Sequence, residues 1–125
     1  MTNIKILIID DEVEFSSTLC QRLELRNIEA VDRHSGSEGI AALTEVQPNI
    51  ILLDMKMADM SGLEVLEHIK QHDPTIEVII LTGHGSIESG KQAKEKGAFD
   101  YIIKPVDLKE LLQKINEAAL KIGRE

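Results

Sequence analysis

The stretch KILIIDDE, at residues 5–12, decides the fold of this chain. It belongs to an aliphatic run at residues 4–9 that leads directly into three acids, Asp10, Asp11 and Glu12. Such a run has no polar alternation, so both faces of the strand are expected to be buried, as in a parallel sheet covered on both sides. Similar runs lie at residues 50–53, 78–81 and 101–103, and a weaker run at residues 28–31 suits an edge strand.

Segments with helical spacing separate these runs. The clearest apolar stripe lies at residues 108–122. The weakest lies at residues 86–96, where only Ile87 and Ala93 form an apolar side, so this helix should pack loosely. Another helix is expected to start near Ser35 or Ser37, which are suitable N-caps. Strand and helix thus alternate five times, which predicts an α/β fold: a doubly wound five-stranded parallel sheet with five helices.

Length and composition limit the classes of function. The 125 residues make about one domain, and the net charge of −8 without a basic stripe argues against direct nucleic-acid binding. No apolar run approaches the roughly 20 residues that a membrane span needs, and no signal peptide is recognisable. The single cysteine, Cys20, excludes an internal disulfide. We expect one acidic, cytoplasmic domain over residues 1–125 with no membrane contact.

Acidic side chains follow two of the predicted strands. The functional crevice of a doubly wound sheet opens at the carboxyl ends of its strands, so Asp10, Asp11 and Asp54 are expected to share one pocket. Two like charges about 4 Å apart repel by about 4 kcal/mol at an effective dielectric constant of about 20. Such a cluster raises carboxylate pKa values or binds a cation, and Mg²⁺ prefers this type of ligand.

Two further side chains end neighbouring strands. Lys104 follows residues 101–103 and is expected to reach the acidic pocket, where its ammonium can pair with a phosphoryl oxygen. Thr82 supplies a hydroxyl group at the end of residues 78–81. A solvated lysine, a turn-capping threonine and helix-capping acids are the simpler alternatives, but the combination favours a functional site.

The spacing of these motifs resembles that of a known family. Asp10-Asp11, then Asp54 with Met57 and Gly62 after it, then Thr82, then Lys104-Pro105 occur in this order. Over about residues 5–122 the chain is similar to the receiver domain of two-component response regulators, and four separated motifs make the resemblance specific. The resemblance implies the flavodoxin-like strand order 2-1-3-4-5.

The resemblance also implies a phosphorylation-activated switch. Asp54 would accept a phosphoryl group from a sensor histidine kinase or phosphotransfer protein, and the chain would catalyse only its own phosphorylation and dephosphorylation. Asp11, Asp54 and the backbone carbonyl of Lys56 would bind Mg²⁺, with Asp10 acting through a bound water. Lys104 would offset charge on the incoming phosphate, and the peptide bond before Pro105 would be cis.

The expected switch involves a second pair of residues. After phosphorylation the Thr82 hydroxyl would turn inward, and the ring of Tyr101 would fill the space it leaves. The loop and helix at residues 83–96 would respond and control an output domain or a downstream protein. Lysines at 91, 94 and 96 form either a solvated helix face or part of a partner or homodimer surface.

The sequence departs from the family pattern at one position. Ala58 stands where the family commonly has proline, so the loop after Asp54 is expected to be less rigid. Lys56 and His84 border the acceptor, where they can alter how water reaches the phosphorylated aspartate. His68 and His72 lie four residues apart on a predicted helix, and a solvated face explains them better than a metal site.

Three other classes of function are alternatives to a phosphorylation switch. A receiver-like docking module that works without phosphorylation is the main alternative. A flavodoxin-type cofactor carrier is disfavoured, because the acids at residues 10–12 would repel the phosphate that its first loop must bind. An aspartate-dependent phosphatase is disfavoured too, because the alternate-residue acid of such enzymes is missing after Asp10.

Overall fold

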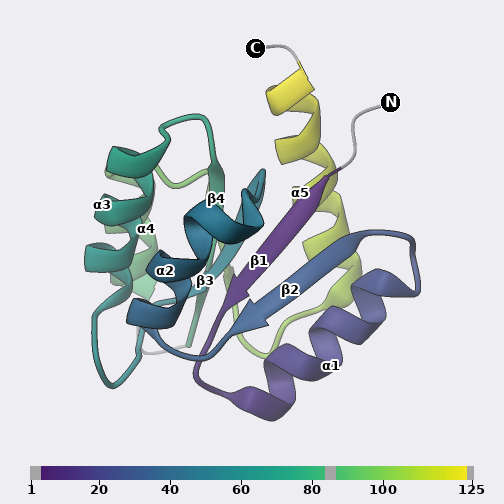
Figure 1. Cartoon of the computed structure of the whole chain (residues 1–125), viewed down its shortest axis with the longest axis horizontal. Coiled ribbons are helices and arrows are strands. Elements are labelled where there is room, and N and C mark those ends of the chain that lie inside the picture. Colours follow the sequence, from purple (N-terminus) through teal and green to yellow (C-terminus); the bar gives the residue numbers. More distant parts are fainter. Residues whose placement is uncertain (1–3, 84–86, 124–125) are drawn as a thin grey trace.

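The computed structural model describes residues 4–83 and 87–123. Within these residues, five parallel strands form one sheet in the order β2-β1-β3-β4-β5, and five helices cover it, so the expected fold and strand order are confirmed (Figure 1). The strands are β1 (Lys5–Ile9), β2 (Glu29–Arg33), β3 (Ile50–Asp54), β4 (Glu77–Thr82) and β5 (Asp100–Ile103). The helices are α1 (Val13–Glu24), α2 (Gly36–Val46), α3 (Gly62–His72), α4 (Ile87–Glu95) and α5 (Leu108–Gly123).

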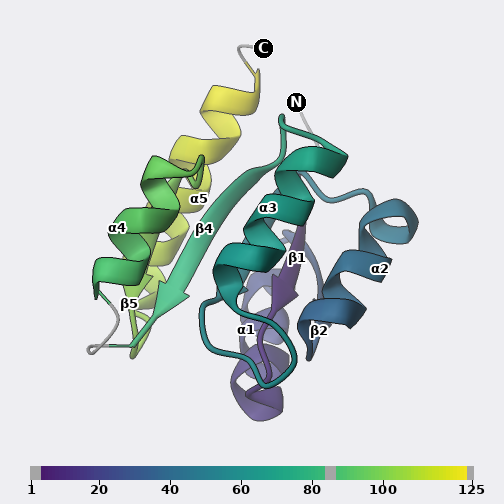
Figure 2. The ribbon, with the colours of Figure 1, turned by 90° about the vertical axis from the view of Figure 1, so that its left-hand side faces the viewer.

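The helices form two layers, one on each face of the sheet. Helices α1 and α5 share a buried cluster with one face, and α2, α3 and α4 share another with the opposite face. Figure 2 shows α3 in front of the sheet, with α2 and α4 on either side of it. No helix in the described part of the chain has both the length and the apolar character needed to cross a membrane.

The central strands are buried on both faces, as their composition predicts. In β1 the side chains of Leu7 and Ile9 belong to the α2–α4 cluster, whereas Ile6 and Ile8 belong to the α1–α5 cluster. All four are 0% exposed. Side chains alternate between the faces of a strand, so an unbroken aliphatic run supplies both layers at once.

Strand β2 is the edge strand that its mixed composition suggests. Only Ala30 is buried in it, and it begins one residue later and ends two residues later than the apolar run. The parallel register explains its extent, since Lys5 pairs with Glu29 and Ile9 with Arg33. At an edge, pairing with the neighbouring strand sets the bounds more than hydrophobicity does.

Helix α4 packs against the sheet through small residues. Gly90 and Ala93 are its buried residues, whereas α5 buries Leu111, Ile115 and Ala118. A Cβ atom at Gly90 would lie 2.9 Å from Cγ of Tyr101, so the tyrosine ring occupies the space that a side chain there would need. The contact of α4 with the sheet is therefore close but small in apolar area, as expected for this segment.

Candidate functional site

Three carboxylates meet at the carboxyl edge of the sheet. Asp10 follows β1 directly, Asp11 begins the loop to α1, and Asp54 is the last residue of β3. One oxygen from each lies within 4.8 Å of the others. Asp10 is 0% exposed and Asp54 is 7% exposed, whereas Asp11 faces solvent. Adjacent parallel strands end at the same edge, and this brings the acids together.

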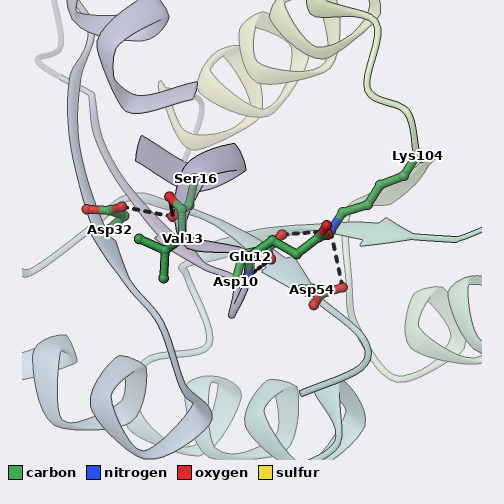
Figure 3. A network of polar contacts seen from close by, with 7 residues as sticks. All are labelled: Asp10, Glu12, Val13, Ser16, Asp32, Asp54 and Lys104. Carbon is green, nitrogen blue, oxygen red and sulfur yellow. Dashed lines mark hydrogen bonds and ion pairs between the residues drawn. The ribbon is translucent and has the colours of Figure 1, made fainter. Parts of the chain in front are cut away.

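The side chain of Lys104 reaches the same pocket from the end of β5. Its ammonium lies 2.9 Å from Asp10 Oδ2, 3.6 Å from Asp54 Oδ1 and 2.5 Å from Glu12 Oε1 (Figure 3). Its backbone N–H donates to the carbonyl of Thr82 at 2.7 Å, which continues the pairing of β5 with β4. The following peptide bond, Lys104-Pro105, is cis.

Burial and mutual repulsion raise the proton affinity of the buried acids. Burial, and then the charge of Asp10, raises the pKa of Asp54 to about 6, although Lys104 and the backbone N–H of Lys56 oppose the shift. Burial also raises the pKa of Asp10, against the hydrogen bond from Lys104. For Lys104 burial favours the neutral form, but hydrogen bonds to Glu12 and Asp10 outweigh it and raise the pKa. The pocket thus contains more negative charge than its ammonium offsets.

This donor set suits a hard divalent cation. Carboxylate oxygens are the ligands that Mg²⁺ prefers, and a cation would relieve the repulsion that raises the pKa of Asp54. Lys56 contributes its backbone to this region and its side chain is exposed. The residues present therefore fit Mg²⁺ by number, charge and proximity.

The loop between β3 and α3 approaches the acceptor strand closely. A Cβ atom at Gly62 would lie 2.7 Å from Cα of Met55 and 3.0 Å from the carbonyl oxygen of Asp54, so the first residue of α3 has no room for a side chain. Ser61 and Glu64 form a capping box at the start of the helix. Gly62 is thus required by the close contact of two backbone segments.

A second attachment ties this loop to helix α2. The carboxylate of Asp59 accepts hydrogen bonds from the backbone N–H groups of Gly36 at 3.0 Å and Ser37 at 2.9 Å. These are the orphan donors of the helix N-terminus, where a negative charge is favourable. The loop is therefore anchored directly after Ala58 without the proline that the family commonly has there, and its reduced rigidity stays a prediction.

The two residues of the expected switch lie on the neighbouring strands β4 and β5, two register positions apart. Thr82 is 0% exposed at the end of β4, one position beyond the pairing of Leu81 with Asp54, and its hydroxyl donates to the carbonyl of Gly83 at 3.5 Å. Tyr101 lies on β5 opposite Ile80 and packs with the α2–α4 cluster, outside the carboxylate group. His84, expected to border the acceptor together with Lys56, lies outside the described residues.

One known family matches most of the chain. Residues 6–116 match the response regulator receiver domain. The chain belongs to this family. Receiver domains act as phosphorylation switches with histidine kinases and output domains, and they bind Mg²⁺ at an acidic pocket.

Solved structures and curated relatives agree with this assignment. A receiver domain protein of Methanospirillum hungatei is 32% identical, with a TM-score of 0.92 and coverage of 98% of both chains. A receiver domain of Clostridium thermocellum is 38% identical, with a TM-score of 0.89 and coverage of 97% of this chain and 95% of that one. The DNA-binding transcriptional regulator NtrC of Klebsiella pneumoniae is 35% identical over 89% of this chain and 24% of its own length. The receiver domain spans roughly a quarter to a half of the curated relatives it matches.

Residues outside the expected set also contribute to the site of this receiver domain. Glu12 is paired with Lys104, and the ring of Phe15 lies 4.7 Å from the same ammonium. Glu12 follows Asp11 directly in the sequence, which is the one signal that marks it. The buried hydroxyl of Ser16 donates to Asp32 Oδ2 at 2.8 Å and so links α1 to β2 beside the acidic loop.

Two other candidate groups lie away from the pocket. His68 and His72 are exposed on α3, and neither belongs to the carboxylate group found among the described residues. Cys20 is buried, and its burial, followed by the charges of Asp32 and Glu24, raises the pKa of the thiol to about 12. A thiol with that pKa is protonated near neutral pH and serves as packing.

Proposed function

We propose that this receiver domain, spanning residues 1–125, is a phosphorylation-activated switch in which Asp54 accepts a phosphoryl group from a sensor histidine kinase or phosphotransfer protein. The observation that carries the proposal is the pocket itself. Carboxylate oxygens of the consecutive residues Asp10 and Asp11 and of the distant Asp54 lie within 4.8 Å of one another, and an ammonium lies 3.6 Å from Asp54. An isolated helix-capping acid or solvated lysine does not explain this combination.

The transfer step uses Asp54 as the nucleophile. A carboxylate oxygen of Asp54 forms a bond to phosphorus while the phosphorus–nitrogen bond of the donor phosphohistidine breaks, and the electron pair stays on the imidazole. The step needs the anionic form of Asp54, which the Lys104 ammonium favours. Lys104 also lies where it can pair with an oxygen of the transferred group. The chain acts only on itself in this step.

The residues expected to hold Mg²⁺ are Asp11, Asp54 and the backbone carbonyl of Lys56, with Asp10 acting through a water. When bound, Mg²⁺ supplies positive charge that offsets the charge of the phosphoryl oxygens. Asp10 is fully buried next to Asp54 and hydrogen-bonded to Lys104, which suits a supporting rather than a leading role. Asp11 is exposed, so it is free to take a direct ligand position.

The phosphorylated pocket would act on α4 through Thr82 and Tyr101. Thr82 carries its hydroxyl at the strand end beside the acceptor strand, and Tyr101 lies directly against Gly90 of α4. A phosphoryl group adds up to about two negative charges and new acceptor oxygens, which would draw the threonine hydroxyl inward. Helix α4 buries the fewest large side chains and is suited to respond.

The output lies in the rest of a longer protein or in a separate partner. The relative NtrC is described as a DNA-binding transcriptional regulator, and this receiver domain matches a quarter of it. We propose a similar arrangement here, with an output domain controlled by the receiver and no nucleic-acid contact from this acidic domain. A homodimer is a further expected partner, and the cytoplasm is the expected setting for a member of this family.

The acceptor is tested by Asp54→Asn. We expect the variant to fold and to take up no label from radioactive acetyl phosphate in the presence of Mg²⁺, because an amide is not a nucleophile of this kind. Asp59→Asn is a matched control on the same loop, with its side chain on α2 instead of in the pocket, and it should label like the parent. Equal labelling of Asp54→Asn and the parent would reject Asp54 as acceptor.

The metal ligands are tested by calorimetric titration with Mg²⁺. We expect Asp11→Ala to weaken Mg²⁺ binding at least tenfold, because it removes a charged ligand. Lys104→Ala should have a much smaller effect, since it removes a cation that repels the metal while leaving every oxygen ligand in place. Similar Mg²⁺ affinities for Asp11→Ala and the parent would remove Asp11 from the ligand set.

A further inference from the structure

The Lys104 ammonium makes its shortest contact with the most exposed of its three carboxylate partners. It lies 2.5 Å from Glu12, 2.9 Å from Asp10 and 3.6 Å from Asp54 (Figure 3). The side chain of Glu12 is 62% exposed, whereas those of Asp10 and Asp54 are 0% and 10% exposed. The buried carboxylates gain more from a cation than an exposed one does, so this order of distances needs an explanation.

The backbone of Glu12 is held firmly while its side chain is left free to reach Lys104. The N–H of Glu12 donates to Asp10 Oδ1 at 2.9 Å, and its carbonyl accepts from Ser16 at 3.0 Å. Glu12 is the N-cap residue of α1, but its carboxylate makes no capping hydrogen bond. Short side chains such as Ser, Asp and Asn are preferred at an N-cap. Helix capping therefore does not account for a glutamate at this position.

The position of the ammonium decides what the buried carboxylates can bind. An ammonium that pairs fully with Asp10 and Asp54 would occupy the oxygens that a divalent cation requires. Glu12 instead draws the ammonium toward the solvent side of the pocket, and the ring of Phe15 at 4.7 Å provides a second favourable contact there. Asp54 is left with the longest of the three contacts.

We propose that Glu12 is a positioning residue that holds the Lys104 ammonium on the Glu12 and Asp10 side of the pocket, so that the oxygens of Asp54 stay available to Mg²⁺. The purpose of this role rests on the proposed function. The role itself is an effect on Mg²⁺ binding by the unphosphorylated protein. It also leaves the ammonium at the entrance, where an incoming phosphoryl oxygen replaces Glu12 as its partner. Glu12 acts through Lys104 and does not touch the metal.

The role is tested by Glu12→Asp, which keeps the charge but shortens the side chain and favours capping of α1. We expect Mg²⁺ to bind Glu12→Asp about three- to tenfold more weakly than the parent in calorimetric titration, because the ammonium moves closer to Asp54 and competes with the metal for its oxygens. Glu14→Asp is the matched control, since Glu14 lies in the first turn of the same helix, and it should bind Mg²⁺ like the parent. Parental affinity in Glu12→Asp would overturn the proposal.

A double-mutant cycle separates positioning from simple charge. In a Lys104→Met background, Glu12→Asp should change Mg²⁺ affinity by less than about twofold, because the ammonium that Glu12 holds is gone. An undiminished effect in that background would show that Glu12 acts on the metal directly, and the positioning role would be wrong. Circular dichroism of each variant shows whether the fold is retained.

Labelling with acetyl phosphate distinguishes this role from the proposed function. At saturating Mg²⁺ we expect Glu12→Asp to label at a rate within about twofold of the parent, while the Mg²⁺ concentration for half-maximal rate rises. If the parent labels and Glu12→Asp binds Mg²⁺ normally, the positioning role fails and the proposed function stands. If the parent never labels but Glu12→Asp still binds Mg²⁺ more weakly, the proposed function fails and the positioning role stands.

Discussion

The interior of the strands and their carboxyl ends differ in what they contribute to the molecule. In β1 and β3, residues such as Ile8 and Leu52 are fully buried aliphatics packed between two helix layers. Directly after β1 and at the last position of β3, Asp10 and Asp54 are buried acids whose pKa values burial raises. The interior stabilises the fold through apolar burial. The strand ends lower that stability, because they hold buried like charges close together.

This difference shows how the site is assembled. The carboxylates repel one another, so their own interactions do not bring them into a pocket. The register of the parallel strands does, since Ile9 pairs with Leu53 and the acids follow directly. The geometry of the site is therefore imposed by the aliphatic segments next to it.

The largest expected effect comes from the interior. Leu52→Ala should lower the free energy of unfolding by about 2–5 kcal/mol, because it removes a fully buried side chain and leaves a cavity. Urea unfolding followed by circular dichroism measures the change. Leu120→Ala is the control, since Leu120 is 55% exposed and its loss should cost less than about 0.5 kcal/mol. A loss below about 1 kcal/mol for Leu52→Ala would contradict the importance of the interior.

A substitution at the carboxyl end should have the opposite sign. Burial raises the pKa of Asp54 to about 6, so above pH 6 the folded protein holds a charge that is less favourable than in the unfolded chain. Asp54→Asn should therefore unfold with a free energy on the order of 1–3 kcal/mol higher at pH 7 in EDTA. The gain should shrink between pH 6 and pH 4, because folded Asp54 takes up its proton there, and it should vanish below about pH 4.

The control for this pH dependence is Asp59→Asn. Hydrogen bonds from the N–H groups of Ser37 and Gly36 lower the pKa of Asp59, so its charge favours the folded state. The variant should be less stable than the parent at neutral pH, and the difference should disappear as the pH falls through the lowered pKa. Equal signs for Asp54→Asn and Asp59→Asn would remove the distinction between the buried acids and the loop.

The smallest expected effect concerns a polar group that lies near the carboxyl ends but stabilises the fold, unlike Asp54. Hydrogen bonds from His34 and Ser16 outweigh burial and lower the pKa of Asp32. Ser16→Ala removes the hydrogen bond from the buried Ser16 hydroxyl to Asp32. The variant should lower the free energy of unfolding in urea by about 1 kcal/mol. Ser17→Ala is the control, because Ser17 is exposed on the same helix turn. If both variants cost the same, the Ser16–Asp32 bond contributes nothing of its own.

Most of the fold could be predicted from the sequence, because buried parallel strands have an unusual composition. The aliphatic runs predict β1, β3, β4 and β5 to within a residue or two at each end, and Ser35 is the N-cap of α2, one of the two serines proposed. The bounds of β2 were less well predicted, because half-exposed residues of an edge strand carry little hydrophobic signal. Its extent depends on the neighbouring strand, which local sequence does not encode.

The placement of the site followed from the strand ends, but its details did not. Asp10, Asp54 and Lys104 meet because strand ends meet, and a sequence pattern contains that information. The contact of Glu12 with Lys104 depends on the rotamers of two long side chains, which no spacing rule describes. The close approach of Gly62 to the backbone of Met55 likewise depends on the path of a loop in space.

The contact between Gly90 and Tyr101 has a consequence for how movement travels through the domain. The ring touches the helix at a position without a side chain, so no flexible group lies between them to absorb a displacement. A turn of the ring toward the helix must push the helix aside, and a shift of the helix toward the sheet must turn the ring. Helix α4 and the ring of Tyr101 are therefore in direct contact and move together. A larger residue at position 90 would clash with the ring and separate the two.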